Sequence, residues 1–396
     1  MTASPSPRIL RRHAEDRYPS YVDDLRTMVN VDCGTYVPDG VNMIADLMQE
    51  RLESTGWAVE RRPHFPEPDV ARFGDVVVAR LTGSRLADAG GLRVLLVGHM
   101  DTVFPPGTAE ERPFRIEGSR AYGPGVSDMK DGLLAGWYAV SCLQDAGFDA
   151  FDSITYVCNP DEEVGSPFSS PIIADFARTA NVCFVLEGAR ENGDIVSARK
   201  GVADLGVVIQ GRAAHAGVEP ERGRSATLQA AHTIVALHGL NGRWPGVTVN
   251  VGTVRGGTRP NVVADSCELG VDVRASTVAT FEEAVAEVER VAVSTVVPDT
   301  VAQIETMAGF PPMEKTASIA RLAERAKEIA ADLGFEVRDA ATGGASDANR
   351  VAAMGVPVLD GLGPIGGADH APGEWVDLDS VVPRVALLAS MIASPF

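Results

Sequence analysis

Residues 93–107 read RVLLVGHMDTVFPPG, and two residue types that bind metals follow directly after an apolar run. Arg93–Val97 is short and apolar and has no helical period, which predicts a buried strand. We expect the chain to turn at Gly98 and to present His99 and Asp101 at a sheet edge, where α/β proteins collect ligands. Residues two apart in an extended backbone share a face, so Asp101 is predicted to orient the His99 ring while the ring's other nitrogen binds a metal. By itself, an HxD pattern also fits an ordinary surface turn, so this interpretation depends on the rest of the chain.

Composition limits the classes of protein that the chain can belong to. At 396 residues it exceeds one ordinary core, which favours two domains. The net charge of −19 argues against a nucleic-acid partner. No apolar run has the length of a membrane span, and the first residues lack the apolar segment of a secretory signal. The cysteines have no CxxC spacing and are expected to be buried thiols in a reducing compartment, which favours a cytoplasmic location; they are Cys33, Cys142, Cys158, Cys183 and Cys267.

Strand and helix patterns alternate over most of the chain. Strands are expected at residues 75–81, 93–97, 151–158 and 182–186, and helices at 39–55, 130–146 and 318–333. This alternation predicts an α/β domain with a mainly parallel sheet covered by helices, formed by residues 1–199 and 311–396.

The pattern of predicted strands and helices changes near Lys200. Strands are expected at residues 205–211, 247–254 and 267–273, and helices at 223–237 and 280–293. Thr280 and Glu283 are spaced as a capping box at the start of the last helix. The pattern predicts an inserted α+β domain of ferredoxin-like type over residues 200–310.

Polar side chains that bind metals recur where the predicted strands and loops end. They are His99, Asp128, Glu162, Glu163, Glu187 and His370. Two imidazoles and three carboxylates can hold two divalent ions if one carboxylate bridges them. Such nitrogen and oxygen ligands suit zinc, with manganese or cobalt as alternatives. In the adjacent pair Glu162–Glu163, one carboxylate can bind metal while the other remains a base. Read alone, the pair would be a solvated acidic turn.

Eight segments occur in an order that resembles a known family. They are GHMDTVFPPG, YGPGVSDMKDG, PDEEVGS, LEG, GRAAHAG, RPNVVAD, TGGASDAN and the late His370. From about residue 75 to the C-terminus the chain resembles the dinuclear zinc hydrolases, which include glutamate carboxypeptidase, succinyl-diaminopimelate desuccinylase, acetylornithine deacetylase and aminoacylase. It is most similar to the glutamate carboxypeptidase branch, at Glu187, ATGGASDAN and EWVDLDSVVPR.

The resemblance implies a role for each residue of this cluster. Asp128 bridges the two ions, and a cis peptide joins it to Met129. The remaining ligands divide into two pairs, one for each ion: His99 with Glu187, and Glu163 with His370. Asp101 orients His99. Glu162 is the general base that takes a proton from a water held between the ions and delivers it to the leaving amine.

The resemblance also implies the reaction and the role of the inserted domain. The expected activity is hydrolysis of an amide bond in a small peptide or N-acyl amino acid that bears a free carboxylate, as by a metallopeptidase of carboxypeptidase type. The inserted domain would be a lid that forms the interface of a homodimer. His215, Asn261 and Arg274 would contact the substrate. Lys200, Asp347, Gly343 and Gly344 would shape the pocket floor.

One segment departs from the carboxypeptidase pattern. That branch has an arginine for the substrate carboxylate near the end of the lid, whereas residues 305–312 (ETMAGFPP) contain none. Arg259 is a candidate replacement, because a guanidinium binds a carboxylate with two parallel hydrogen bonds. The departure affects substrate specificity but not the reaction class.

Two alternatives remain open from the sequence. The chain could be a deacylase of the acetylornithine or succinyl-diaminopimelate type. It could also be a metal-binding relic that has lost catalysis and serves in binding or assembly. The presence of Glu162 beside all five ligand candidates argues against a relic, because a protein that only binds metal has no need of an unligated base.

Overall fold

The structure is a computed structural model that describes residues 4–396, apart from the side chain of Ala308. The chain forms two compact units. The first comprises the residues up to Ser197 together with Lys315–Ala341 and Ser346–Phe396, and the second comprises Ala198–Glu314 and Thr342–Ala345. Within the described chain, no helix has both the length and the apolar character needed to span a bilayer.

The first unit carries most of the helices. Its helices are α1 (Pro7–Val29), α2 (Pro38–Ser54), η1 (Ala87–Ala89), α3 (Thr108–Glu111), η2 (Val126–Lys130), α4 (Asp131–Asp145), η3 (Glu162–Val164), α5 (Ser170–Ala177), α8 (Ala317–Leu333), α9 (Asp347–Ala353) and α10 (Leu378–Ala393). Its strands are β1 (Ala58–Arg62), β2 (Val76–Thr82), β3 (Arg93–His99), β4 (Arg115–Glu117), β5 (Arg120–Tyr122), β6 (Ser153–Asn159), β7 (Val182–Val185), β14 (Val358–Leu359), β15 (Gly366–Gly367) and β16 (Trp375–Asp377). Two further strands, β8 (Ile195–Arg199) and β13 (Asp339–Thr342), each continue past a unit boundary.

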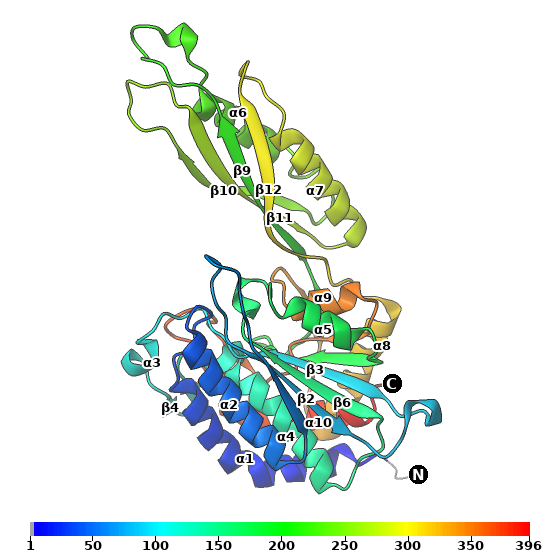
Figure 1. The fold of residues 1–396 in the computed structure, drawn as a ribbon. Coiled ribbons are helices and arrows are strands. Elements are labelled where there is room, and N and C mark those ends of the chain that lie inside the picture. Colours follow the sequence, from blue (N-terminus) through cyan, green and yellow to red (C-terminus); the bar gives the residue numbers. More distant parts are fainter. Residues whose placement is uncertain (1–3) are drawn as a thin grey trace. The chain divides into compact units, whose positions relative to one another are not determined.

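A six-stranded sheet forms the centre of the first unit, in the order β1-β2-β6-β3-β7-β14. β6, β3, β7 and β14 are parallel, and β1 and β2 complete the sheet as antiparallel strands. Helices α1, α2, α4 and α10 cover one face, and α5 and α9 cover the other (Figure 1). The predicted α/β class with a mainly parallel, helix-covered sheet is therefore confirmed.

The central strand β3 is buried along almost its whole length, as its apolar sequence predicts. Gly98 lets α4 and its preceding turn approach the strand, because a Cβ there would lie 2.9 Å from Met129 Cε and 3.1 Å from Leu133 Cδ2. The strand continues through Gly98 and ends at His99, so the chain does not turn at Gly98 as predicted.

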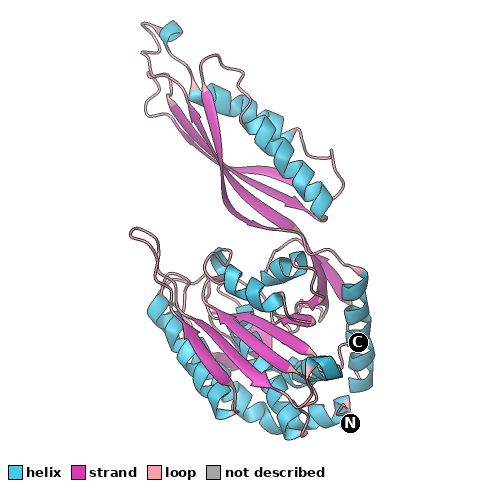
Figure 2. Ribbon diagram, turned by 45° about the vertical axis from the view of Figure 1, so that its right-hand side comes forward, coloured by secondary structure: helices cyan, strands magenta, loops and turns pink. Residues whose placement is uncertain are grey.

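The second unit is a four-stranded antiparallel sheet in the order β10-β11-β9-β12. Its elements follow one another as β9 (Gly201–Gln210), η4 (Pro220–Arg222), α6 (Ala226–His238), β10 (Thr248–Gly256), β11 (Ser266–Ala275), α7 (Val278–Ala292) and β12 (Val301–Phe310). Both long helices lie along one face of the sheet (Figure 2). Apolar residues of β9, β11, α6 and α7 form a core between the helices and the sheet. This βαββαβ order is the predicted ferredoxin-like arrangement.

One local prediction in the second unit is wrong, and one strand is missing from the predicted set. Helix α7 begins at Val278 with Thr277 as its N-cap, whose side chain accepts a hydrogen bond from Thr280 N, so Thr280 does not start a capping box. A threonine three residues earlier takes this role because the helix starts sooner than the periodicity indicates. Strand β12 is not among the strands expected from the sequence.

Candidate metal centre

The parallel strands deliver four of the predicted site residues to one edge of the central sheet. His99 is the last residue of β3, and it stands opposite Asn159, the last residue of β6. Glu162 and Glu163 form the short turn η3 just beyond β6, and Glu187 follows β7 closely. Since parallel strands end at a common edge, their C-terminal residues converge there.

Asp128 lies at the centre of this cluster, between two histidines. Its Oδ1 is 3.0 Å from His99 Nε2, and its Oδ2 is 3.0 Å from His370 Nε2. Glu163 Oε2 is 3.2 Å from the same His370 nitrogen, and Glu187 Oε1 is 3.8 Å from His99 Nε2. The two oxygens of one carboxylate thus face two different imidazoles, each of which has a second carboxylate nearby. The peptide bond between Asp128 and Met129 is cis, as the family resemblance implied.

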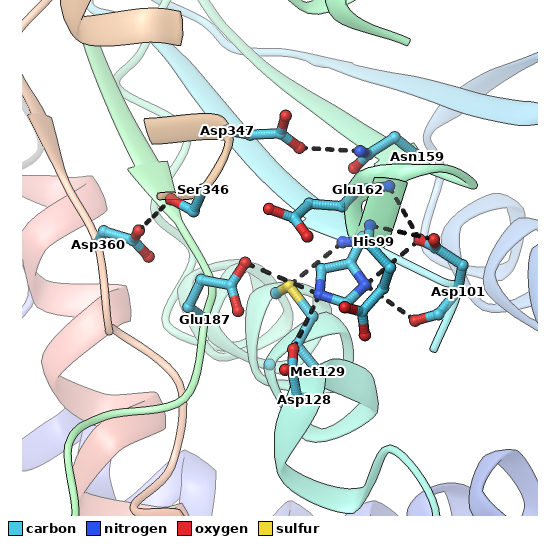
Figure 3. Close-up of polar contacts among 12 residues, drawn as sticks. His99, Asp101, Asp128, Met129, Asn159, Glu162, Glu187, Ser346, Asp347 and Asp360 are labelled. Carbon is cyan, nitrogen blue, oxygen red and sulfur yellow. Dashed lines mark hydrogen bonds and ion pairs between the residues drawn. The ribbon is translucent and has the colours of Figure 1, made fainter. Parts of the chain in front are cut away.

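Potential ligand atoms gather in two groups that share His99. One group is His99, Asp128 and Glu163, and the other is His99, Glu162 and Glu187; within each group the ligand atoms lie within 4.8 Å of one another. Figure 3 shows Glu162, Glu187 and Asp128 around the His99 ring. Glu162 and Glu163 therefore each belong to one of these groups, in each case together with His99.

Asp101 is fully buried behind His99 and makes more contacts than the sequence predicted. His99 Nδ1 lies 2.9 Å from the backbone carbonyl oxygen of Asp101 and 3.4 Å from its carboxylate Oδ1. The carboxylate also accepts hydrogen bonds from the backbone N–H groups of Glu162 (3.2 Å) and Glu163 (3.3 Å) and from the Thr35 hydroxyl (2.7 Å). Asp101 therefore contacts both the His99 ring and the turn that carries the two glutamates.

The pKa values of the cluster reflect close charge pairing in a buried place. Burial by itself lowers the pKa of the His99 imidazole, but hydrogen bonds with Asp101 and Asp128 raise it well above its ordinary value. Burial opposes ionisation of Asp128, yet the hydrogen bonds from His370 and His99 hold the pKa of its carboxyl well below the usual range. Burial raises the pKa of the Glu162 carboxyl well above its usual range. Cations in contact with these carboxylates would favour their charged forms.

The residues present fit divalent metal ions. Glu163 Oε1 is buried and has no hydrogen-bond partner among the described residues, which leaves an acceptor available for a cation. Carboxylates outnumber the nearby imidazoles, and unpaired buried charge is costly. A donor set of imidazole nitrogen and carboxylate oxygen is the set that zinc and similar ions bind.

A cavity of about 420 Å³ begins at Glu163. It is lined by Gly34–Val37, Thr102–Pro106, Glu163 and Val164, and Glu163 is the only charged side chain among them. The walls are fixed to one another, since Thr35 N donates to Thr102 O and Thr102 N donates to Cys33 O. The first unit therefore has a preformed hollow beside the candidate ligands that can take an uncharged part of a small molecule.

The second unit brings together three of the four residues predicted to bind substrate. Ala216 N donates to Asn261 O at 3.0 Å, and Val262 N donates to Arg259 O at 3.1 Å, while His215 forms a β-bridge with Val262. Arg274 lies on strand β11, where its guanidinium donates to the Asp272 carboxylate and to the Gly343 carbonyl oxygen. His215, Arg259 and Asn261 are exposed.

The structure adds residues that the sequence reading missed. Glu374 is buried and accepts three backbone hydrogen bonds from the loop that carries Asp128. Lys130 is also buried, and its ammonium group donates to the carbonyl oxygens of Val31 and Pro124. Asp347, predicted to shape the pocket floor, accepts hydrogen bonds from Asn159 and Ser166, which flank the Glu162 turn. Glu374 is the first residue of EWVDLDSVVPR, a segment that contributed to the family resemblance, but nothing in that segment assigned Glu374 a role.

Comparison with known proteins agrees with this geometry. Residues 95–394, three quarters of the chain, match peptidase family M20/M25/M40. The chain belongs to this family.

Several relatives of this M20 chain are carboxypeptidases or deacylases. It is 29% identical to carboxypeptidase G2 of Pseudomonas sp. (strain RS-16) over 97% of this chain and 91% of that protein. It is 27% identical to succinyl-diaminopimelate desuccinylase of Acidovorax ebreus (strain TPSY), over 87% and 91% of the two chains. Among solved structures, the aminopeptidase PepT of Bacillus cereus ATCC 10987 shares the fold with a TM-score of 0.76 at 23% identity, covering 96% of this chain and 98% of that one.

Membership confirms the family resemblance that the sequence motifs indicated and establishes the general activity. This M20 chain is a hydrolase of peptides or N-acyl amino acids, and enzymes of its family bind metal ions. The structure contains a cluster of His, Asp and Glu side chains that could hold a metal ion.

Proposed function

We propose that this protein is a dinuclear metal amidohydrolase, with zinc as the expected metal, that cleaves an amide bond in a small peptide or N-acyl amino acid bearing a free carboxylate. The observation that carries the proposal is the position of Asp128, whose two carboxylate oxygens each lie 3.0 Å from a different histidine. Asp128 would bridge two ions, with His99 and Glu187 on one and Glu163 and His370 on the other.

The chain's own groups then have separate tasks. The Asp101 carboxylate holds His99 and the turn of Glu162 and Glu163 in place through one contact with the His99 ring and two with the backbone of the turn. Glu162 accepts the proton of the attacking water and returns it to the nitrogen of the leaving amine as the C–N bond breaks. Bound divalent ions would polarise the amide carbonyl and lower the pKa of water.

The substrate's carboxylate would be bound by the second unit. His215, Asn261 and Arg259 are exposed and lie on adjacent segments there, and a guanidinium such as that of Arg259 or Arg274 can hold a carboxylate. We further propose that the second unit acts as a lid and forms a homodimer interface, and that the protein works in the cytoplasm, where its five free buried cysteines would stay reduced.

Substitution of the two adjacent glutamates tests the assignment of base and ligand. In Glu162→Gln, kcat should fall by about 10²–10⁴-fold or more, because a general base typically contributes this factor, while both ions stay bound. In Glu163→Gln, metal binding should weaken. Elemental analysis of zinc-reconstituted protein measures the metal content, and two ions per wild-type chain are expected. One ion or none in the wild type, or near-normal kcat in Glu162→Gln with zinc bound, would refute the proposal.

The substrate class is tested on the same reconstituted enzyme. Dipeptides and N-acyl amino acids with acetyl, succinyl and aromatic acyl groups would be compared by kcat/KM, with a chelator control. Dipeptide cleavage indicates a peptidase, whereas activity confined to N-acetyl or N-succinyl amino acids indicates a deacylase.

A further inference from the structure

Two ligand-bearing segments of the proposed metal centre, far apart in the sequence, meet at one buried carboxylate. Asp128 follows the loop Gly123–Ser127, and His370 lies in the turn between β15 and β16. Glu374 immediately precedes β16 and is 1% exposed. It is not among the residues that would touch either ion.

The Glu374 carboxylate accepts three backbone hydrogen bonds from the loop that leads to Asp128. Its Oε1 accepts the N–H groups of Ser127 (2.8 Å) and Asp128 (3.0 Å), and its Oε2 accepts that of Gly125 (3.0 Å). A carboxylate is the side chain that can accept at both oxygens at once. One of these donors is the backbone N–H of Asp128, the residue whose side chain lies between the two histidines.

The same loop also contacts a cation, through one of its backbone carbonyl groups. Lys130 Nζ donates to Pro124 O at 2.9 Å and to Val31 O at 3.0 Å. The loop's N–H groups therefore face an anion while one of its carbonyl groups faces a cation, which fixes the orientation of its peptide dipoles. The loop cannot rotate without breaking charge-assisted hydrogen bonds, which are stronger than neutral ones.

The hairpin that carries Glu374 also carries His370, and it packs directly on the loop. Trp375 pairs with Tyr122, which leads into the loop, and Gly367 pairs with Trp375 across the hairpin. At Gly366 a Cβ would lie 2.1 Å from Ser127 Oγ, so only glycine permits this approach. One hairpin thus determines the positions of both partners in the contact between Asp128 Oδ2 and His370 Nε2.

We infer that Glu374 is a positioning residue for the ion pair, which aligns Asp128 with His370 by holding the Asp128 loop against the hairpin. The inference rests on the proposed function, because it needs ions held by Asp128 and His370. Partners that orient metal ligands usually contribute 10- to 100-fold to metal affinity.

Metal titration of metal-free Glu374→Gln provides the test. The variant keeps the side chain's size, but its amide NH₂ must face at least one N–H donor of the loop. We expect zinc affinity at one of the two sites to fall about 10- to 100-fold, as measured by competition with a chromophoric chelator. The absorption spectrum of the cobalt-loaded variant should change as well, since it reports the geometry of the ligands.

The matched control is Asp32→Asn. The Asp32 carboxylate also accepts two backbone N–H groups, from Gly107 (2.7 Å) and Ala109 (2.8 Å), but that loop carries no metal ligand. The control should bind zinc as the wild type does. Thermal unfolding of each metal-free variant shows whether it is folded, and Glu374→Asp, which keeps the charge on a shorter side chain, replaces Glu374→Gln if the latter is not.

The outcomes separate the inference from the proposed function. Wild-type zinc affinity in folded Glu374→Gln, or in the Asp variant that replaces it, overturns the inference, as does an equal loss of affinity in Asp32→Asn. A wild-type protein that binds fewer than two ions instead overturns the dinuclear function itself.

Discussion

Replacing Asp101 with Asn should weaken metal binding and lower the free energy of unfolding. The size of both effects can be worked out from the hydrogen bonds that the Asp101 carboxylate accepts. Asp101 Oδ1 accepts the N–H of Glu162, and Oδ2 accepts that of Glu163, so either orientation of the new amide points its NH₂ at one of these donors. The Thr35 hydroxyl can turn to accept, but a backbone N–H cannot. A buried donor without a partner costs about 1–3 kcal/mol, which corresponds to about 5- to 150-fold in an equilibrium constant.

The assay compares Asp101→Asn with the wild type in two measurements. Chelator competition measures zinc affinity, which we expect to fall within that range because the disturbed turn carries Glu163. Denaturant unfolding of the metal-free proteins measures the free energy of unfolding, which should drop by about 1–3 kcal/mol. Asp32→Asn again serves as the control for zinc affinity. If Asp101→Asn binds zinc within twofold of wild type and unfolds at the same denaturant concentration, the reasoning about this carboxylate is wrong.

Three further predictions concern the substrate, the assembly and the pH dependence of stability. Amidating the substrate's free carboxylate should lower kcat/KM, because binding and orientation are lost; equal values for the acid and its amide would contradict a carboxylate site. If the protein is a two-fold dimer in which His215 completes the partner's site, inactive His215→Ala and Glu162→Gln subunits should, after exchange, recover about a quarter of wild-type activity. No recovery, once subunit exchange has been verified, would place His215 in its own subunit's site. Although partial burial opposes ionisation of Asp339, hydrogen bonds from Lys315, Lys327 and Ser197 hold the pKa of its carboxyl well below the usual range, so its ionised form stabilises the fold. This contribution is complete above the unfolded-state pKa of about 4 and is lost as the pH falls further. Asp339→Asn should therefore lower the urea midpoint at pH 7 but progressively less below pH 4, and a constant difference would disprove the linkage.

The sequence by itself determined the domain types and much of the candidate metal centre. Arg93–Val97, 151–158 and 182–186 are apolar runs too short for helices, and the residues after them carry imidazole or carboxylate groups. Parallel strands end at a common edge, so these groups had to converge once the strands formed one sheet. The position of His99 relative to Glu163 and Glu187 follows from this rule.

The sequence was less informative where no periodic pattern exists. His370 and Ala368 both have positive φ, a conformation that side chains other than glycine rarely adopt and that depends on the surrounding structure. The start of α7 at Val278 depends on which of two threonines, Thr277 or Thr280, caps the helix. Strand β12 is recognisable mainly because it pairs with β9.

Only the tertiary structure decided how the ligands are held. Which nitrogen of His99 faces Asp128, and the double role of Asp101 toward the ring and the Glu162 turn, depend on contacts between segments remote in sequence. Glu374 is 246 residues from Asp128, and no sequence pattern predicted that the two residues would meet. Its positioning role is inferred from its burial and from the three backbone N–H groups that donate to it. Local sequence determines where strands form and which chemical groups follow them. The hydrogen-bond partners of a buried charge come from remote segments, so they are determined only when the chain folds.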